Sequence, residues 1–64
     1  MTRKEIFEKI IAIGKFENKT ATEIAFLIRE SSIQKTNSVC LCLEKYHYYL
    51  KGSKKDGKKL YSTA

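Results

Sequence analysis

The 64 residues suffice for one small domain, because a chain of this length buries only about 60% of the surface that it exposes when unfolded. Hydrophobic residues make up 42% and charged residues 31% of the chain, which excludes a disordered tail. No apolar run approaches the ~20 residues that a membrane span requires. No apolar signal-peptide core follows the N-terminus, so we expect a cytoplasmic protein.

The formal net charge of +6 is concentrated in the second half of the chain. Residues 1–34 carry six basic and five acidic side chains, whereas residues 35–64 carry seven basic and two acidic ones. A positive charge gathered in one region attracts a polyanion, and an even mixture does not. Nucleic acid is therefore the first candidate partner.

Two capping boxes predict the first two helices. Thr2 with Glu5, and Thr20 with Glu23, have the spacing in which side chain and backbone exchange hydrogen bonds at a helix start. Apolar residues at helical spacing follow each box. Gly14 ends the first helix, and the serines at 31 and 32 end the second. The predicted helices span residues 3–13 and 21–30.

The third helix is predicted over residues 34–46, with a strand as the alternative because residues 39–50 are rich in β-branched and aromatic side chains. Its inward stripe is expected to be Val39, Cys42, Leu43 and Tyr46, which are spaced three and four residues apart. The outward face then collects Gln34, Asn37, Ser38, Cys40, Leu41, Glu44 and Lys45.

A β-hairpin is predicted over residues 48–62, with strands at 48–52 and 58–62. The turn near 54–57 contains Asp56 and Gly57, which tolerate the positive φ of a tight turn. Leu50 and Leu60 are expected on one face, docked on the helices. Three helices followed by a hairpin predict an α+β fold, a winged helix-turn-helix that forms a single domain over residues 1–64.

This arrangement suits double-stranded DNA. The major groove admits one helix, and the second helix of a helix-turn-helix motif enters it with its N-terminal half leading. Asparagine and glutamine read adenine edges, while lysines on the hairpin contact phosphates. The expected DNA-binding residues are Gln34, Lys35, Thr36, Asn37, Ser38, Leu41, Lys45, Lys54, Lys55 and Lys58.

Catalytic and metal chemistry have little support in the sequence. His47 is the only histidine, and Cys40, Cys42 and His47 lack the spacing and number of ligands of a zinc site. No glycine-rich phosphate loop or serine elbow is present. We therefore expect no enzyme activity, no cofactor and no metal.

Three short motifs carry a family resemblance: Lys19-Thr20-Ala21-Thr22-Glu23-Ile24-Ala25, Leu43-Glu44-Lys45, and the basic hairpin that ends in Leu60-Tyr61. They resemble small winged-helix regulators of fimbrial operons, of the pyelonephritis-associated and K88 pilus type. The resemblance implies a bacterial transcriptional regulator that works beside a leucine-responsive-type regulatory protein. A phage regulator fits the same motifs.

The alternative reading is a protein-interaction module. In that reading Cys40, Leu41 and the tyrosines of the third helix and hairpin dock on another regulator or on a polymerase. Exposed apolar residues on the third helix would favour it. A membrane surface is a weaker candidate, because the chain lacks a basic amphipathic helix.

Overall fold

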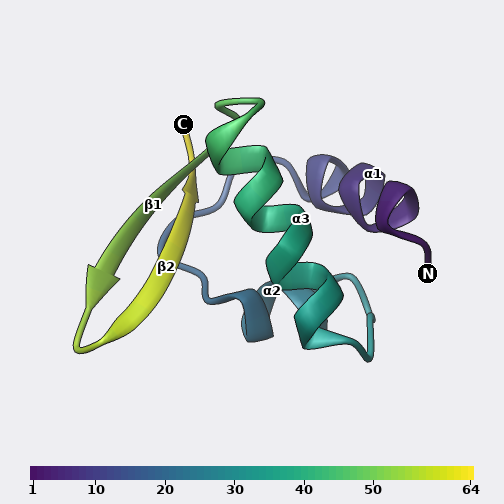
Figure 1. Ribbon diagram of the computed structural model, residues 1–64, viewed down its shortest axis with the longest axis horizontal. Helices are drawn as coiled ribbons and strands as arrows, with labels where there is room; N and C mark the ends of the chain where they lie inside the picture. Colours follow the sequence, from purple (N-terminus) through teal and green to yellow (C-terminus); the bar gives the residue numbers. More distant parts are fainter.

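The computed structural model describes residues 1–64, the whole chain. Three helices are followed by one antiparallel hairpin, which is the α+β arrangement predicted for a winged helix (Figure 1). The elements are α1 (Arg3–Ile13), α2 (Ala21–Leu27), α3 (Ile33–Lys45), β1 (Leu50–Lys55) and β2 (Lys58–Thr63).

Capping boxes begin α1 and α2, as predicted. At α1 the Glu5 N–H donates to the Thr2 hydroxyl (3.2 Å), and the Thr2 N–H donates to the Glu5 carboxylate (2.8 Å). The same two bonds join Thr20 and Glu23 at 3.1 and 3.0 Å. Each box satisfies backbone N–H groups that a helix start leaves unpaired, and so fixes where the helix begins.

The end of α2 differs from the prediction, because the helix stops at Leu27 and not at residue 30. Arg29 has a φ of 59°, which is left-handed. The Arg29 N–H donates to the Phe26 carbonyl (3.2 Å) and the Glu30 N–H to the Ala25 carbonyl (2.9 Å). These bonds form a Schellman motif. Its left-handed position usually holds glycine, so an arginine there carries no sequence signal for a helix end.

The rotation of α3 about its axis also differs from the prediction. Four of its residues are buried: Thr36, Val39, Cys40 and Leu43. Cys42 is exposed and Tyr46 is 75% exposed, although both were predicted to face inward. Thr36 tolerates full burial because its hydroxyl donates to the Ser32 carbonyl (3.0 Å). A threonine that bonds to its own helix therefore takes a core position that an apolar pattern does not reveal.

The hairpin turns at Asp56 and Gly57, the two residues that indicated the turn. Their φ values of 53° and 77° are both positive, which defines the two-residue turn that matches the twist of paired strands. Lys54 and Lys55, which were predicted in the turn, belong to β1, so this strand ends at Lys55 and not at residue 52. β1 starts at Leu50 and not at residue 48, since Tyr48 has a φ of 52°, outside the range of a strand. β2 reaches Thr63, one residue beyond the prediction.

Leu50 and Tyr61 attach the hairpin to the helices, and they are only 3% and 1% exposed. The register places Gly52 opposite Tyr61, so Leu50, Gly52 and Tyr61 share the inner face. Leu60 pairs with Ser53 on the outer face, where it is half-buried. The prediction that Leu50 docks on the core is confirmed, and the prediction that Leu60 shares its face is wrong.

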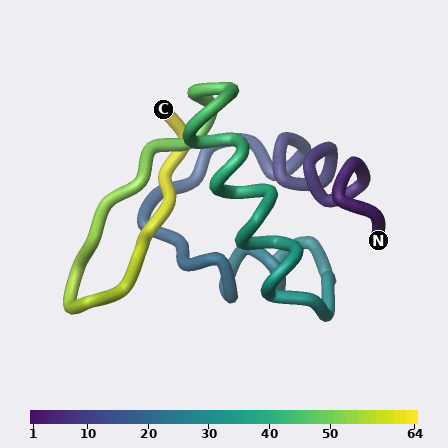
Figure 2. The backbone as a smooth tube through the Cα atoms, in the orientation of Figure 1, coloured from purple at the N-terminus to yellow at the C-terminus, as the bar shows by residue number.

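The connection between α1 and α2 runs along the second edge of β2. Backbone hydrogen bonds join Lys19 and Tyr61 in both directions (2.9 and 2.7 Å), and the Thr63 N–H donates to the Phe16 carbonyl (3.0 Å). Figure 2 shows this connection passing beside the C-terminal strand. β2 is therefore paired on both sides, which ties the hairpin to the first half of the chain.

All five elements contribute to one core. Its buried members are Ile6, Ile10, Phe16, Ile24, Ile28, Val39, Cys40, Leu43, Leu50 and Tyr61. Full burial of each large apolar side chain stabilises the fold by about 1.5–3 kcal/mol. None of the three helices combines the length and the hydropathy that crossing a bilayer requires.

Candidate nucleic-acid interface

The exposed face of α3 carries mainly polar side chains. Gln34, Leu41 and Lys45 are seven and four residues apart, so they lie on one face, opposite the stripe that packs on the core. Gln34 and Lys45 are exposed, and Leu41 is half-buried. Asn37 is also exposed and lies on the same side of the helix as Glu44, seven residues further on. This face therefore offers two side-chain amides to a ligand, those of Gln34 and Asn37.

Two expected contact residues lie away from this face, and a third lies at its edge. Thr36 is fully buried, and a side chain in the core cannot reach DNA, so we remove it from the expected contacts. The Lys35 ammonium donates to the Met1 carbonyl (3.4 Å), beside α1. Ser38 lines a shallow hollow between α1 and α3 together with Phe7. Lys35 is exposed on the α1 side of the helix. Ser38 is also exposed and, four residues after Gln34 and seven before Lys45, lies at the edge of the candidate face that borders α1.

The hairpin presents four exposed lysines that take part in no ion pair: Lys51, Lys54, Lys55 and Lys58. Lys55 pairs with Lys58 directly beside the turn. In Figure 1 the hairpin turn lies at the lower left and the first turn of α3 at the lower right, so both are on the lower side of the view but well apart along its long axis. The hairpin thus carries four ammonium groups that are free of ion pairs, and its only acidic residue is Asp56.

Glu44 and Lys59 join α3 to the hairpin. The Lys59 ammonium lies 2.8 Å from the Glu44 carboxylate. Gly52 lies directly against this pair, since a Cβ atom there would be 2.7 Å from Lys59 Cε and 2.9 Å from Glu44 Cδ. An ion pair this open to solvent contributes little stability. The pair directs the Lys59 ammonium toward α3 and so occupies one of the five hairpin lysines.

Sequence reasoning missed the pair of Glu44 and Lys59, because the two residues belong to different elements. One signal for it exists in the sequence. A glycine inside a strand marks a place where another group approaches closely, and Gly52 is such a glycine. Lys51 is a further exposed lysine of β1 that the expected contact set omitted.

Two buried groups beside this pair are held in their neutral forms. Burial raises the pKa of the Cys40 thiol to about 12. Burial, with smaller contributions from Cys40 and Glu44, raises the pKa of the Tyr61 hydroxyl to about 12. The Tyr61 hydroxyl also has no hydrogen-bond partner.

The residues considered for other chemistry are dispersed. The His47 ring packs edge-on against Phe7, with 5.0 Å between ring centroids. Cys40 is buried and Cys42 is exposed, because side chains two residues apart in a helix point in nearly opposite directions. No three side chains of the histidine, cysteine, aspartate or glutamate type lie close enough together to hold a metal ion.

Neither family models, curated sequences nor solved structures match this chain. The likeness to fimbrial-operon regulators therefore stays a prediction from short motifs. What the molecule offers for a functional argument is its own surface: the outer face of α3, the lysine hairpin, and the ion pair that connects them.

Proposed function

We propose that this chain is a sequence-specific DNA-binding regulator of transcription, without catalytic activity of its own. The observation that carries the proposal is the exposed polar face of α3 beside a hairpin with four unpaired lysines. A single helix fits the major groove, and lysines on long flexible stems suit phosphates. In this proposal α3 reads base edges while the hairpin fixes the position of the protein on the duplex.

Within α3, Asn37 and Gln34 are the proposed base-reading residues, because an amide can form two hydrogen bonds to adenine. Leu41 and Lys45 extend the same surface toward a thymine methyl group and a phosphate. In the hairpin, Lys51, Lys54, Lys55 and Lys58 are the proposed phosphate contacts. Lys59 is excluded from this group because Glu44 holds it.

The first test is fluorescence anisotropy of a labelled random duplex at several salt concentrations. We expect binding that weakens steeply as salt rises, with a slope of about −0.9 for each phosphate contact on a logarithmic plot. Absence of binding even at low salt would overturn the proposal.

Two kinds of substitution then separate reading from anchoring. Lys54→Ala and Lys55→Ala should weaken binding to every duplex and reduce the salt slope by about 0.9 each. Lys9→Ala, on the exposed face of α1, is the matched control and should leave the slope unchanged. Asn37→Ala should instead reduce discrimination between selected and random sequences by about 1–3 kcal/mol. Equal losses on all sequences would remove Asn37 from the reading role.

The motif likeness to fimbrial-operon regulators supports one extension. In that extension the protein acts in the bacterial cytoplasm and binds its site next to a leucine-responsive-type regulator. Retarded migration of DNA with both proteins, at concentrations where neither binds alone, would support it. Independent binding of the two proteins to the same fragment would argue against it.

A protein-interaction module is the second candidate function. The observation that favours it is the exposure of Tyr46 (75%) and Tyr48 (78%) at the junction between α3 and β1. Cys40 no longer belongs to that candidate surface, since it is buried in the core. Binding to a protein partner that persists at high salt, with negligible affinity for DNA, would select this function.

A further inference from the structure

Lys59 is the one hairpin lysine whose ammonium group is held by the protein. It lies 2.8 Å from the Glu44 carboxylate of α3 and 5.5 Å from the centre of the Tyr61 ring, which is within the range of a cation–π contact. Lys59 is half-buried, whereas the other four hairpin lysines are exposed and take part in no ion pair. Its ammonium group is therefore engaged before any ligand arrives.

The hairpin register places Lys59 among the proposed phosphate contacts. It pairs with Lys54 across the hairpin, so the two side chains leave the same face. Lys58 directly precedes it and is exposed. A lysine at this position would meet the same stretch of phosphates as its neighbours if its ammonium group were free. The contact with Glu44 is what sets Lys59 apart from them.

Gly52 leaves the space that this ion pair occupies. A Cβ atom there would lie 2.7 Å from Lys59 Cε and 2.9 Å from Glu44 Cδ, closer than Cβ atoms approach other atoms in proteins. The backbone itself does not require glycine, because Gly52 lies within β1 and its φ is not positive. A glycine inside a strand often marks the close approach of another group, and here that group is the ion pair. Any side chain at position 52 would displace the two ions.

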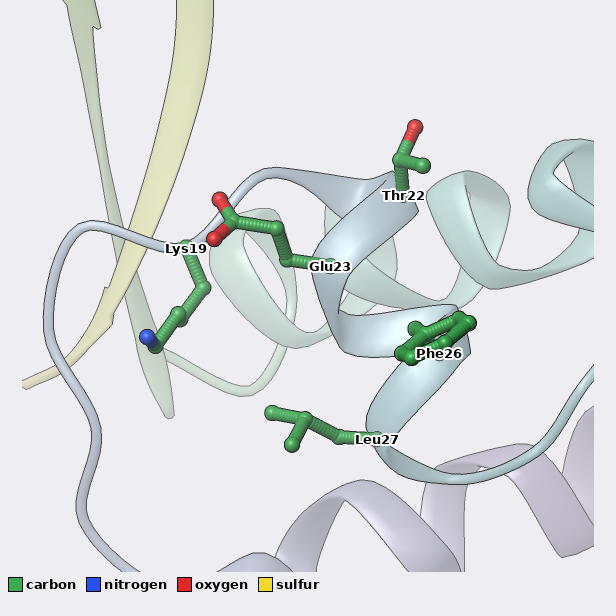
Figure 3. Close-up of a pocket in the computed structure, with 5 residues that line it drawn as sticks. All are labelled: Lys19, Thr22, Glu23, Phe26 and Leu27. Carbon is green, nitrogen blue, oxygen red and sulfur yellow. The ribbon is translucent and has the colours of Figure 1, made fainter.

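A second carboxylate, that of Glu23, lies near the hairpin but holds none of its lysines. It lines a surface hollow together with Lys58. The Thr20 N–H donates to it at 3.0 Å, in the capping box of α2. Figure 3 shows it turned toward the chain that enters α2, beside Lys19. Glu44 caps no helix, and its carboxylate is the one that takes a hairpin lysine.

We propose that Glu44 competes with DNA phosphates for Lys59, so that the hairpin carries one phosphate contact that the protein itself blocks. This inference rests on the proposed DNA-binding function. Transfer of Lys59 to a phosphate would leave the Glu44 carboxylate without a counterion beside a polyanion, and like charges repel. Each phosphate contact adds to the affinity for any duplex, so the ion pair lowers non-specific binding. Glu44 thus acts as an internal inhibitor of the hairpin.

A double-mutant cycle tests the proposal, with fluorescence anisotropy of a labelled random duplex at several salt concentrations. Glu44→Gln should steepen the salt slope by up to about 0.9, the value of one further phosphate contact. Lys59→Gln alone should leave the slope unchanged, because this lysine makes no contact in the unchanged protein. The double variant should return to the original slope, because the lysine that gains the contact is then absent.

Gly52→Ala separates the same two ions without changing the charge of the protein, so it should steepen the slope as Glu44→Gln does. Glu8→Gln is the matched control, since it removes an exposed carboxylate of α1 and should leave the slope unchanged. Circular dichroism establishes that each variant remains folded. An ion pair with a purely structural role would change the free energy of unfolding in these variants without changing the salt slope.

An unchanged slope in Glu44→Gln would overturn the proposal. So would a gain that persists in the double variant, since it would then come from the lost acidic charge and not from Lys59. A loss of about 0.9 in Lys59→Gln alone would also overturn it, because this lysine would already contact a phosphate. Absence of any binding by the unchanged protein overturns the proposed function together with this inference, whereas binding that does not respond to Glu44→Gln overturns this inference alone.

Discussion

Tyr61 combines a core ring with a polar atom that nothing satisfies. The side chain is 1% exposed, and its hydroxyl has no hydrogen-bond partner. A buried hydroxyl in that state costs about 1–3 kcal/mol relative to a paired one. The ring meanwhile fills the space between the hairpin and α3. The ring therefore stabilises the fold, whereas the unpaired hydroxyl destabilises it.

We therefore expect Tyr61→Phe to leave the free energy of unfolding unchanged or to raise it by about 1 kcal/mol. Urea unfolding followed by circular dichroism measures this change. Tyr61→Ala is the comparison, and it should lose about 3–5 kcal/mol because the ring is removed as well. A loss of more than about 1 kcal/mol in Tyr61→Phe would show that the hydroxyl is stabilising.

At the residue scale, only some of the buried side chains of α3 could be predicted from the sequence. Val39 and Leu43 are predictable as core residues from their apolar character and their spacing. Thr36 and Cys40 are not, because one is a polar residue that bonds to the Ser32 carbonyl and the other is small enough for either face. One wrong assignment of this kind rotates the predicted helix and changes which side chains are offered to DNA.

At the scale of the helices, three carboxylates fix helix ends and are sensitive to acid. The pKa values of Glu5, Glu23 and Glu30 are lowered, first by backbone N–H groups of Thr2, Thr20 and Ser32. A carboxylate whose pKa is lower in the folded state stabilises that state above its unfolded pKa. This contribution is lost as the pH falls through the folded value.

Stability should therefore be level at neutral pH and decline below about pH 4.5. Thermal unfolding measured at a series of pH values tests this expectation. Glu5→Gln and Glu23→Gln keep an acceptor for the backbone N–H but cannot titrate, so each should flatten the acidic limb of the curve. Unchanged limbs in both variants would assign the acid sensitivity to other groups.

The starts of the helices and the turn of the hairpin were predictable because each has its own local chemistry. A threonine followed three residues later by glutamate, or aspartate followed by glycine, settles the backbone within one turn. The end of α2 and the start of β1 depend on Arg29 and Tyr48 in left-handed conformations. Tertiary packing imposes those conformations. Arginine and tyrosine do not favour a positive φ, so the sequence does not predict them.

At the scale of the whole molecule, the hairpin is part of the core. Leu50 and Tyr61 are among its buried members, and Lys19 pairs with β2 across most of the chain length. No sequence pattern reveals this pairing, because a single bridging residue has no alternation to detect. The concentration of positive charge in the second half was, by contrast, plain from the sequence.

A fragment of residues 1–48 should therefore fail to fold, although it contains all three helices. We expect low helicity by circular dichroism and poorly dispersed amide signals by nuclear magnetic resonance. Lys54→Ala in the full chain is the control, and it should change stability by no more than about 0.5 kcal/mol, because Lys54 is exposed. Cooperative unfolding of the fragment would show that the helices form a core alone.

The bridge between Lys19 and Tyr61 covers part of the outer edge of β2, whereas no segment pairs with the outer edge of β1. An open edge invites a strand from another molecule and so invites aggregation, and charged side chains along it deter such additions. Lys51, Lys54 and Lys55 lie on this strand. The lysines that we assign to phosphate contacts therefore also keep the free protein from joining edge to edge, and a variant that loses all three should become prone to aggregate even where its fold is intact.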